Sequence, residues 1–100
     1  MPATSAPEPP STLVVVGVDT HRDTHVAAAR DQLGRPLGGL EIPTTPEGYR
    51  QLLSWARGLG QVETFGVEGT GSYGAGLARY LRAAGVKVAE VNRPNRQERR

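Results

Sequence analysis

Apolar side chains fall into short runs along the chain, and most runs end at glycine, proline or a single acid. The most apolar run, Leu13 to Asp19, has five leucine and valine residues and one glycine before its carboxylate. A short valine-rich run of this kind predicts a strand that is buried on both faces. A second run, over 64–68, ends at Glu68 and is followed by a glycine-rich turn. The pattern therefore predicts two strands that each end in an acid.

The residues between these two strands predict a meander followed by a helix. Residues 24–30 and 37–42 favour two further strands, since turn-forming glycine and proline separate them. Thr45 can then cap a helix in which Pro46 takes the first position. The apolar face expected for this helix comprises Tyr49, Leu52, Leu53 and Ala56, and the glycines expected to end it are Gly58 and Gly60.

After the strand that ends at Glu68, the pattern predicts a second helix and a last strand. Thr70 or Ser72 is expected to cap this helix, and Gly85 to end it. A short apolar strand over 86–91 follows. The expected buried face of the second helix comprises Tyr73, Leu77, Leu81 and Ala84.

This order of elements predicts an α/β fold with a mixed five-stranded sheet, strand order 3-2-1-4-5, and two helices. The early meander requires antiparallel pairing, whereas strand–helix–strand units require right-handed crossovers and parallel pairing. The strands ending at Asp19 and Glu68 then become parallel neighbours, about 4.8 Å apart. Two carboxylates at that spacing repel each other, and a bound Mg²⁺ (or Mn²⁺) relieves the repulsion. The alternative is that both are ordinary strand-end acids that cap the next turn.

Composition divides the chain into three parts. Residues 1–12 contain four prolines and predict a disordered lead-in, residues 13–92 hold the foldable sequence, and residues 93–100 form a basic tail. The guanidinium groups of the tail suit phosphate or nucleic acid, and a solvated tail is the alternative. These groups belong to Arg93, Arg96, Arg99 and Arg100. The chain has no cysteine and no apolar run of the ~20 residues that a membrane span requires, which is compatible with a cytoplasmic protein.

The glycine-rich turn after Glu68 is a second candidate site for phosphate. Thr70 and Ser72 are the candidates for contacting a nucleic-acid backbone there, with backbone N–H groups at a helix start facing the anion. The alternative is a plain turn and helix cap, with Tyr73 packed in the core.

The remaining polar and aromatic groups favour structural roles. Asp23 is expected to form the turn before the second strand. His21 and His25 do not suit a zinc site, because Arg22 rather than glutamate follows the first histidine and the stretch is not helical. The aromatic residues expected in or near the core are Tyr49, Trp55 and Phe65.

Two motifs, Val16–His25 and Val67–Gly74, resemble the N-terminal part of the DEDD transposases of bacterial insertion sequences, of the insertion-sequence-110 type. The element order with its two acids also resembles the RNase H-like (RuvC-like) fold of Holliday-junction resolvases. The resemblance covers about residues 14–96 and implies a DNA recombinase whose four acids bind divalent metal. Asp19 would be the first of these acids and Glu68 the second.

Further expectations follow from this resemblance. It implies metal-dependent phosphodiester cleavage and strand transfer in DNA transposition, in a bacterial cytoplasm. It also implies a guide RNA, encoded by the element, that pairs with DNA, and a homo-oligomer of the full-length protein. The other two aspartates of the family lie on a later helix. The chain is therefore expected to be a truncated transposase or a piece of one, incomplete at its C-terminus and inactive alone.

Two other functions stay open on the sequence. One is an actin-like or sugar-kinase ATPase half-domain, whose fold also begins with a strand ending in aspartate. Such proteins need a glycine directly after that acid, where this chain has Thr20 and His21. The other is a non-catalytic remnant that binds nucleic acid through its arginines, for which steep salt dependence without sequence preference is typical.

Overall fold

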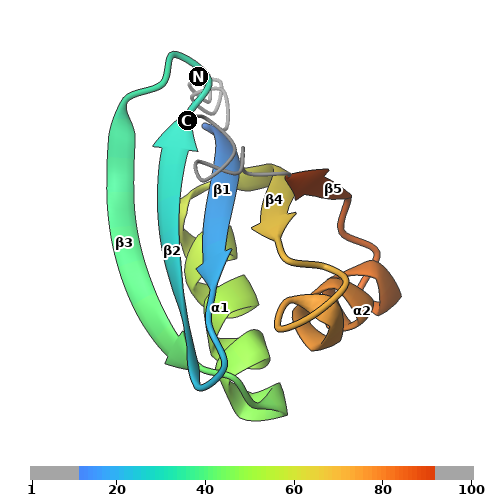
Figure 1. Ribbon diagram of the computed structural model, residues 1–100. Coiled ribbons are helices and arrows are strands. Elements are labelled where there is room, and N and C mark those ends of the chain that lie inside the picture. The colour runs from blue at the N-terminus through green and yellow to red at the C-terminus, as the bar shows by residue number, and fades with distance from the viewer. Residues whose placement is uncertain (1–11, 92–100) are drawn as a thin grey trace, which may run out of the picture.

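The computed structural model describes residues 12–91 of the 100-residue chain. These residues form a five-stranded mixed sheet with two helices, in the strand order β3-β2-β1-β4-β5 (Figure 1). The predicted α/β fold and strand order are confirmed. The elements are β1 (Leu13–Thr20), β2 (Thr24–Asp31), β3 (Pro36–Pro43), α1 (Pro46–Leu59), β4 (Gln61–Glu68), α2 (Ala75–Ala83) and β5 (Val88–Val91). The predicted lead-in over 1–12, apart from its last residue, and the tail with Arg93, Arg96, Arg99 and Arg100 lie outside the described residues.

β1 lies at the centre of the sheet and takes part in both kinds of pairing. It runs antiparallel to β2, with Val18 opposite Ala27, and parallel to β4, with Val18 beside Val67. β3 pairs antiparallel with β2 at one edge of the sheet, and β5 pairs parallel with β4 at the other. Because β1 and β4 are parallel, their last residues meet at the same end of the sheet.

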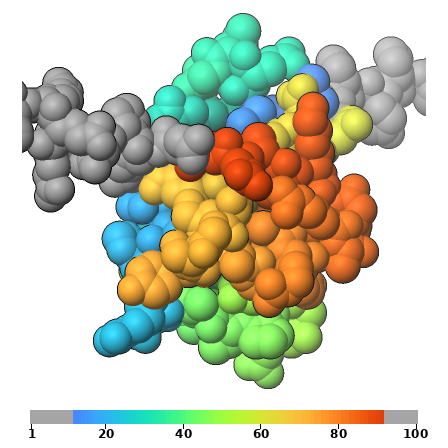
Figure 2. Space-filling model, turned by 45° about the vertical axis from the view of Figure 1, so that its right-hand side comes forward, coloured from blue at the N-terminus to red at the C-terminus, as the bar shows by residue number. Residues whose placement is uncertain are grey.

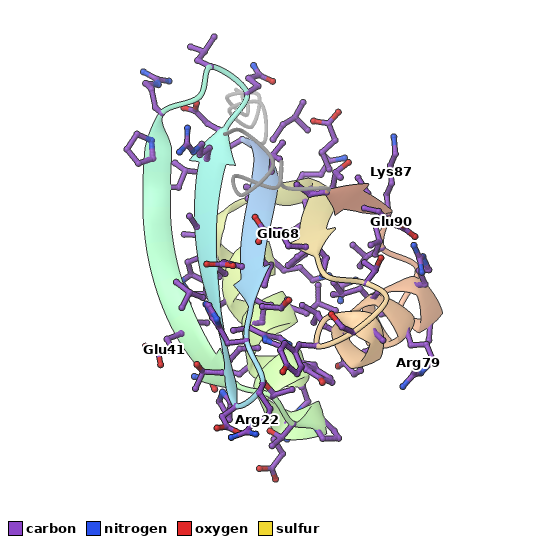
Figure 3. All side chains as sticks on the ribbon, in the orientation of Figure 1. Arg22, Glu41, Glu68, Arg79, Lys87 and Glu90 are labelled. Carbon is purple, nitrogen blue, oxygen red and sulfur yellow. The ribbon has the colours of Figure 1, made fainter. Side chains whose placement is uncertain are left out.

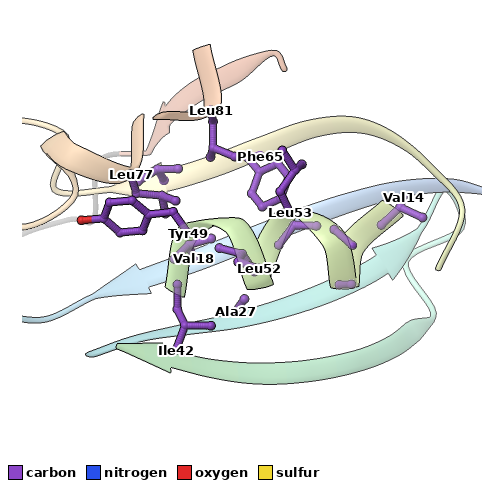
Figure 4. Packing of buried hydrophobic residues seen from close by; sticks show 14 residues of the cluster. Val14, Val18, Ala27, Ile42, Tyr49, Leu52, Leu53, Phe65, Leu77 and Leu81 are labelled. Atoms are coloured by element: carbon purple, nitrogen blue, oxygen red, sulfur yellow. The ribbon is translucent and has the colours of Figure 1, made fainter. Parts of the chain in front are cut away.

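Both helices pack against the same face of the sheet. Their buried leucines join every second side chain of the central strands in one cluster (Figure 4). In Figure 2 the start of α1 (green) lies directly below α2 (orange). Fully burying a leucine or phenylalanine side chain stabilises the fold by about 1.5–3 kcal/mol. The cluster includes Val14, Val16 and Val18 of β1, Leu52 and Leu53 of α1, Phe65 of β4, and Leu77 and Leu81 of α2.

Neither helix covers the opposite face of the sheet. Val15 and Val26, which point to this side, are 38% and 44% exposed. The prediction that β1 is buried on both faces is therefore wrong, because α1 and α2 lie on one side. We call this second surface the open face. It comprises Val15, Gly17, Asp19, Val26, Ala28, Arg30, Gly66, Glu68 and Val91.

The start of α1 follows the sequence closely. The Thr45 side chain accepts a hydrogen bond of 3.0 Å from the backbone N–H of Gly48, and Pro46 is the first helical residue, as predicted. A side chain at Gly48 would collide with the carbonyl of Pro43, so glycine lets the helix begin directly after β3. All four apolar-face residues of this helix are buried.

The end of α1 is later than expected. The helix runs through Gly58 to Leu59, and Gly60 follows it as the C-cap. The prediction that Gly58 helps to end the helix is therefore wrong. Gly58 faces solvent and its missing side chain contacts nothing, so the helix continues through it.

The start of α2 differs from the prediction. Its N-cap is Gly74, and no side chain caps the helix, so the expected caps by Thr70 or Ser72 are wrong. Five residues instead form a backbone turn between Glu68 and Gly74. In it, the N–H groups of Ser72 and Gly74 donate to the Gly69 carbonyl at 2.9 and 2.7 Å.

The buried side of α2 is narrower than expected. Leu77 and Leu81 are buried as predicted, whereas Ala84 follows the helix and is exposed. Tyr73 precedes the helix and is 52% exposed, so the prediction that it packs in the core is wrong. In the described part of the chain, no helix is long and apolar enough to span a membrane.

Candidate active site on the open face of the sheet

The two strand-end acids lie side by side on the open face. Val18 pairs with Val67, so Asp19 and Glu68 are the next residues on two adjacent parallel strands. Both line one cavity of about 420 Å³, and both are half-buried. Figure 3 shows Glu68 over the open face beside β1. The predicted meeting of these two acids at one end and one face of the sheet is therefore present.

A side-chain hydrogen bond ties the ends of the two strands together. The Thr20 hydroxyl donates to the Glu68 carbonyl at 2.9 Å. Gly69 follows with a φ of +66°, and a side chain there would come within 2.9 Å of the Thr20 Oγ1. Gly74 also packs directly against the Glu68 carbonyl. These contacts hold the backbone on either side of both carboxylates and limit how far the acids can separate.

His21 is a neighbour of the acids that the sequence analysis did not assign to the site. Its Nε2 atom lies 3.3 Å from Oδ2 of Asp19, whose side chain is 41% exposed. A tight turn, closed by a 3.0 Å hydrogen bond from the His21 N–H to the Thr24 carbonyl, brings the imidazole back toward the strand end. Arg22 lies at the tip of this turn (Figure 3). The sequence did offer a signal for this contact, because His21 follows Asp19 by two residues in a predicted turn.

The other turn residues make structural contacts. Asp23 lies in the turn before β2, as predicted, and its carbonyl accepts a 3.0 Å hydrogen bond from the Thr44 N–H. His25 has a different environment from His21, because it is fully buried and its ring stacks on Tyr49. Burial lowers the pKa of His25. A hydrogen bond to the Thr24 backbone raises this pKa in part, and the nearby His21 lowers it further.

The turn over 69–74 does not have the geometry of the expected phosphate cradle. The N–H groups of Ser72 and Gly74 point inward to the Gly69 carbonyl, and α2 begins only at Ala75. The Ser72 hydroxyl also lies toward Gly69, at 3.4 Å from its carbonyl oxygen. Contact of Thr70 and Ser72 with nucleic acid therefore stays a prediction, without a helix start to support it.

The donor set at the acids suits a hard divalent cation. Asp19 and Glu68 offer carboxylate oxygens in one cavity, and Mg²⁺ is commonly held by one or two carboxylates together with water and phosphate oxygens. Within residues 12–91 there is no group of three or more histidine, cysteine or acidic side chains placed to hold a metal ion. The two acids therefore fit an ion that keeps open positions for other ligands.

Comparison with known protein families identifies the family of the chain. The family model of the DEDD transposases of insertion sequence 110, described as a transposase, matches residues 16–100. The chain belongs to this transposase family. Both motifs that carried the resemblance lie inside the matched range, and transposases of this family act on DNA. The match favours this assignment over an ATPase half-domain. No curated protein matches the chain.

Proposed function

We propose that Asp19 and Glu68 bind Mg²⁺ (or Mn²⁺) and form part of the site at which this transposase cleaves and joins DNA phosphodiesters. The observation that carries the proposal is the placement of both carboxylates at adjacent strand positions, in one cavity of the open face. Carboxylates at neighbouring strand positions carry like charge, and a bound divalent cation lowers the repulsion between them.

Each residue at the site then has a distinct task. The carboxylates of Asp19 and Glu68 supply oxygen ligands from two rigid strands, and Thr20 keeps the strand ends together. The His21 imidazole, 3.3 Å from Asp19, orients that carboxylate. A bound divalent ion supplies Lewis-acid stabilisation of the charge on phosphate oxygens.

The finer assignments rest on the family resemblance. Four acids are implied for the complete site, and the two motifs of this chain supply Asp19 and Glu68. We also propose that the complete protein acts as a homo-oligomer with a guide RNA that pairs with DNA. The family match over residues 16–100 supports the transposase assignment, on which these proposals depend.

Metal titration tests the assignment of the two acids. We expect Mn²⁺, followed by electron paramagnetic resonance, to bind the full chain at least about tenfold more weakly in Asp19→Asn and in Glu68→Gln, because each variant removes one of two charged ligands. Glu63→Gln is the matched control, since Glu63 is an exposed acid on the same strand as Glu68. Unchanged Mn²⁺ affinity in both site variants would refute the proposal.

A further inference from the structure

The two helices form a groove on the side of the molecule opposite the open face. Its volume is about 630 Å³, which is within the range of pockets that bind ligands. Its wall from α2 is one helical stripe about 10 Å long, from Gly76 to Ala83. We call this surface the tyrosine groove. The residues that line it are Pro46, Tyr49, Gly76, Arg79, Tyr80 and Ala83.

The two tyrosines give the groove a fixed aromatic surface. The ring centroids of Tyr49 and Tyr80 lie 5.9 Å apart, with the ring planes tilted by 49°. Tyr49 is held from behind, because the buried His25 stacks on its ring at a centroid distance of 6.0 Å. Within residues 12–91, neither tyrosine hydroxyl forms a hydrogen bond. The groove therefore offers two ring faces and two hydroxyls to a ligand, with little conformational entropy left to lose.

The chain contains one segment whose chemistry fits such a surface. Residues 7–10 read Pro-Glu-Pro-Pro. Proline-rich segments favour the polyproline II helix, whose carbonyl groups make no internal hydrogen bonds, and they dock in aromatic-lined grooves. In that helix Pro7 and Pro10 lie on one edge, about 9 Å apart. This spacing matches the length of the stripe from Gly76 to Ala83.

Charge complementarity favours the same segment. Glu8 is the only charged side chain among residues 1–11, and Arg79 is an exposed cation that lines the groove. Figure 3 shows Arg79 extending away from α2. Within the described part of the chain, no carboxylate forms an ion pair with Arg79. Glu8 can therefore pair with this arginine without breaking an existing ion pair.

Chain length shows which copy supplies the segment. The Thr12 carbonyl accepts a 2.7 Å hydrogen bond from the Gln61 N–H, just beyond the end of α1. Tyr49 lies near the other end of this helix, about 15 Å away along its axis. Pro10 precedes Thr12 by two residues, which span at most about 7 Å. Pro10 therefore cannot reach the tyrosines of its own chain.

We propose that the tyrosine groove binds the segment Pro7–Pro10 of a second copy of this chain as a polyproline II helix, with Glu8 paired to Arg79. Exchange of the two segments in both directions makes a symmetric pair of copies. This inference does not depend on the proposed function, because the groove and the two acids lie on opposite sides of the sheet. A proline-rich segment of a different protein is the competing occupant.

Peptide binding tests the groove directly. The probe is a fluorescein-labelled peptide of residues 1–12, and anisotropy measures its binding to the full chain with Pro7→Ser, Pro9→Ser and Pro10→Ser, whose own lead-in no longer competes. We expect saturable binding. A peptide that carries Pro7→Ser and Pro10→Ser should bind at least tenfold more weakly, because it loses the preformed helix and both ring contacts.

A charge exchange tests the assigned pair. Arg79→Glu in the protein should weaken binding of the original peptide about fivefold, since like charges then meet. A peptide with Glu8→Arg should restore the affinity for this variant to within twofold of the original pair, which a merely structural role of Arg79 does not predict. Arg57→Glu is the matched control, because Arg57 is an exposed arginine at the far end of α1, and it should change the affinity by less than twofold.

Sedimentation velocity tests whether a second copy supplies the segment. In the original protein we expect a dimer whose share rises with concentration, and either Arg79→Glu or Glu8→Arg alone should lower that share. Mixing the two variants should restore it, because both contacts of a mixed pair join opposite charges, whereas each variant alone joins like charges.

The outcomes decide the proposal. Peptide binding with the charge rescue, together with a dimer restored on mixing, supports it. An absence of peptide binding overturns it, and so does equal binding of the peptide without Pro7 and Pro10. If the peptide binds but the original protein stays monomeric at the same concentrations, or mixing restores no dimer, the second copy is overturned as the occupant and a different proline-rich protein is favoured.

Discussion

The two faces of the sheet use neighbouring residues of the same strand for different purposes. Val16 points to the helices and is fully buried, whereas Val15 points to the open face and stays partly exposed. The covered face collects the large side chains of both helices, and the open face collects glycine, alanine and charge. The alternation of a strand therefore places the stabilising side chains and the candidate site on opposite faces, because each successive residue points to the other side of the sheet.

The two faces should respond differently when one valine on each is shortened. We expect Val16→Ala to lower the free energy of unfolding by about 2–3 kcal/mol, since it removes buried methyl groups and leaves a cavity. The matched change Val15→Ala should cost at most about 1 kcal/mol, because that side chain is partly exposed. Urea denaturation measures both values. Equal losses would mean that the open face is packed as tightly as the covered one.

The helices of the covered face begin in two different ways, which a pair of capping variants can test. Thr45→Ala should lower the free energy of unfolding by about 1 kcal/mol, because the side chain satisfies the N–H of Gly48. Ser72→Ala should change it by less than about 0.5 kcal/mol, because no side chain caps α2. Thermal unfolding of the two variants measures the contrast. A larger loss in Ser72→Ala would contradict the backbone start of α2.

The smallest expected effect concerns His25, the buried histidine of the covered face. Burial lowers the pKa of His25 in the folded protein. Below about pH 6.5, His25 therefore binds a proton in the unfolded chain more readily than in the folded chain. The contribution of neutral His25 to the free energy of unfolding is therefore present above that pH. It falls as the pH drops, by at most about 0.7 kcal/mol between pH 7 and 6. Urea denaturation across this range should show the fall, and His25→Phe should lack it.

A second group limits the pH range of that measurement. The backbone N–H of Arg35 donates to the Asp31 carboxylate and lowers its pKa, so the stability from this contact is present above about pH 4 and is lost as the pH falls through the lowered value. A fall in stability that begins only below pH 4 in the original protein would belong to Asp31 and would contradict the role given to His25.

Much of the fold could be predicted because local signals and topology agree. The pair Thr45 and Pro46 marks the start of α1 through side-chain and ring geometry that act within a few residues. The meeting of Asp19 and Glu68 follows from parallel pairing of two strands that each end in an acid. The first inference needs only neighbouring residues. The second needs only the order of the strands and the helix between Asp19 and Glu68.

The remaining features depend on contacts that the sequence pattern does not carry. A run of consecutive valines does not show which side will be covered, so the exposure of Val15 was missed. Three residues between Gly69 and Gly74 offer hydroxyl groups, yet backbone bonds to the Gly69 carbonyl decide where α2 begins.

The hydrogen bond from Thr20 to Glu68 has a consequence for the energetics of ligand capture. Since this hydroxyl fixes the spacing of the two strand ends in the folded chain, the carboxylates need no reordering of the loop when a cation arrives. A mobile loop would lose conformational entropy when it binds a ligand, whereas these strand ends have already lost that entropy during folding. If the two acids bind a cation as proposed, Thr20→Ser should keep this advantage and Thr20→Val should lose it, although residue 20 itself need not contact the ion.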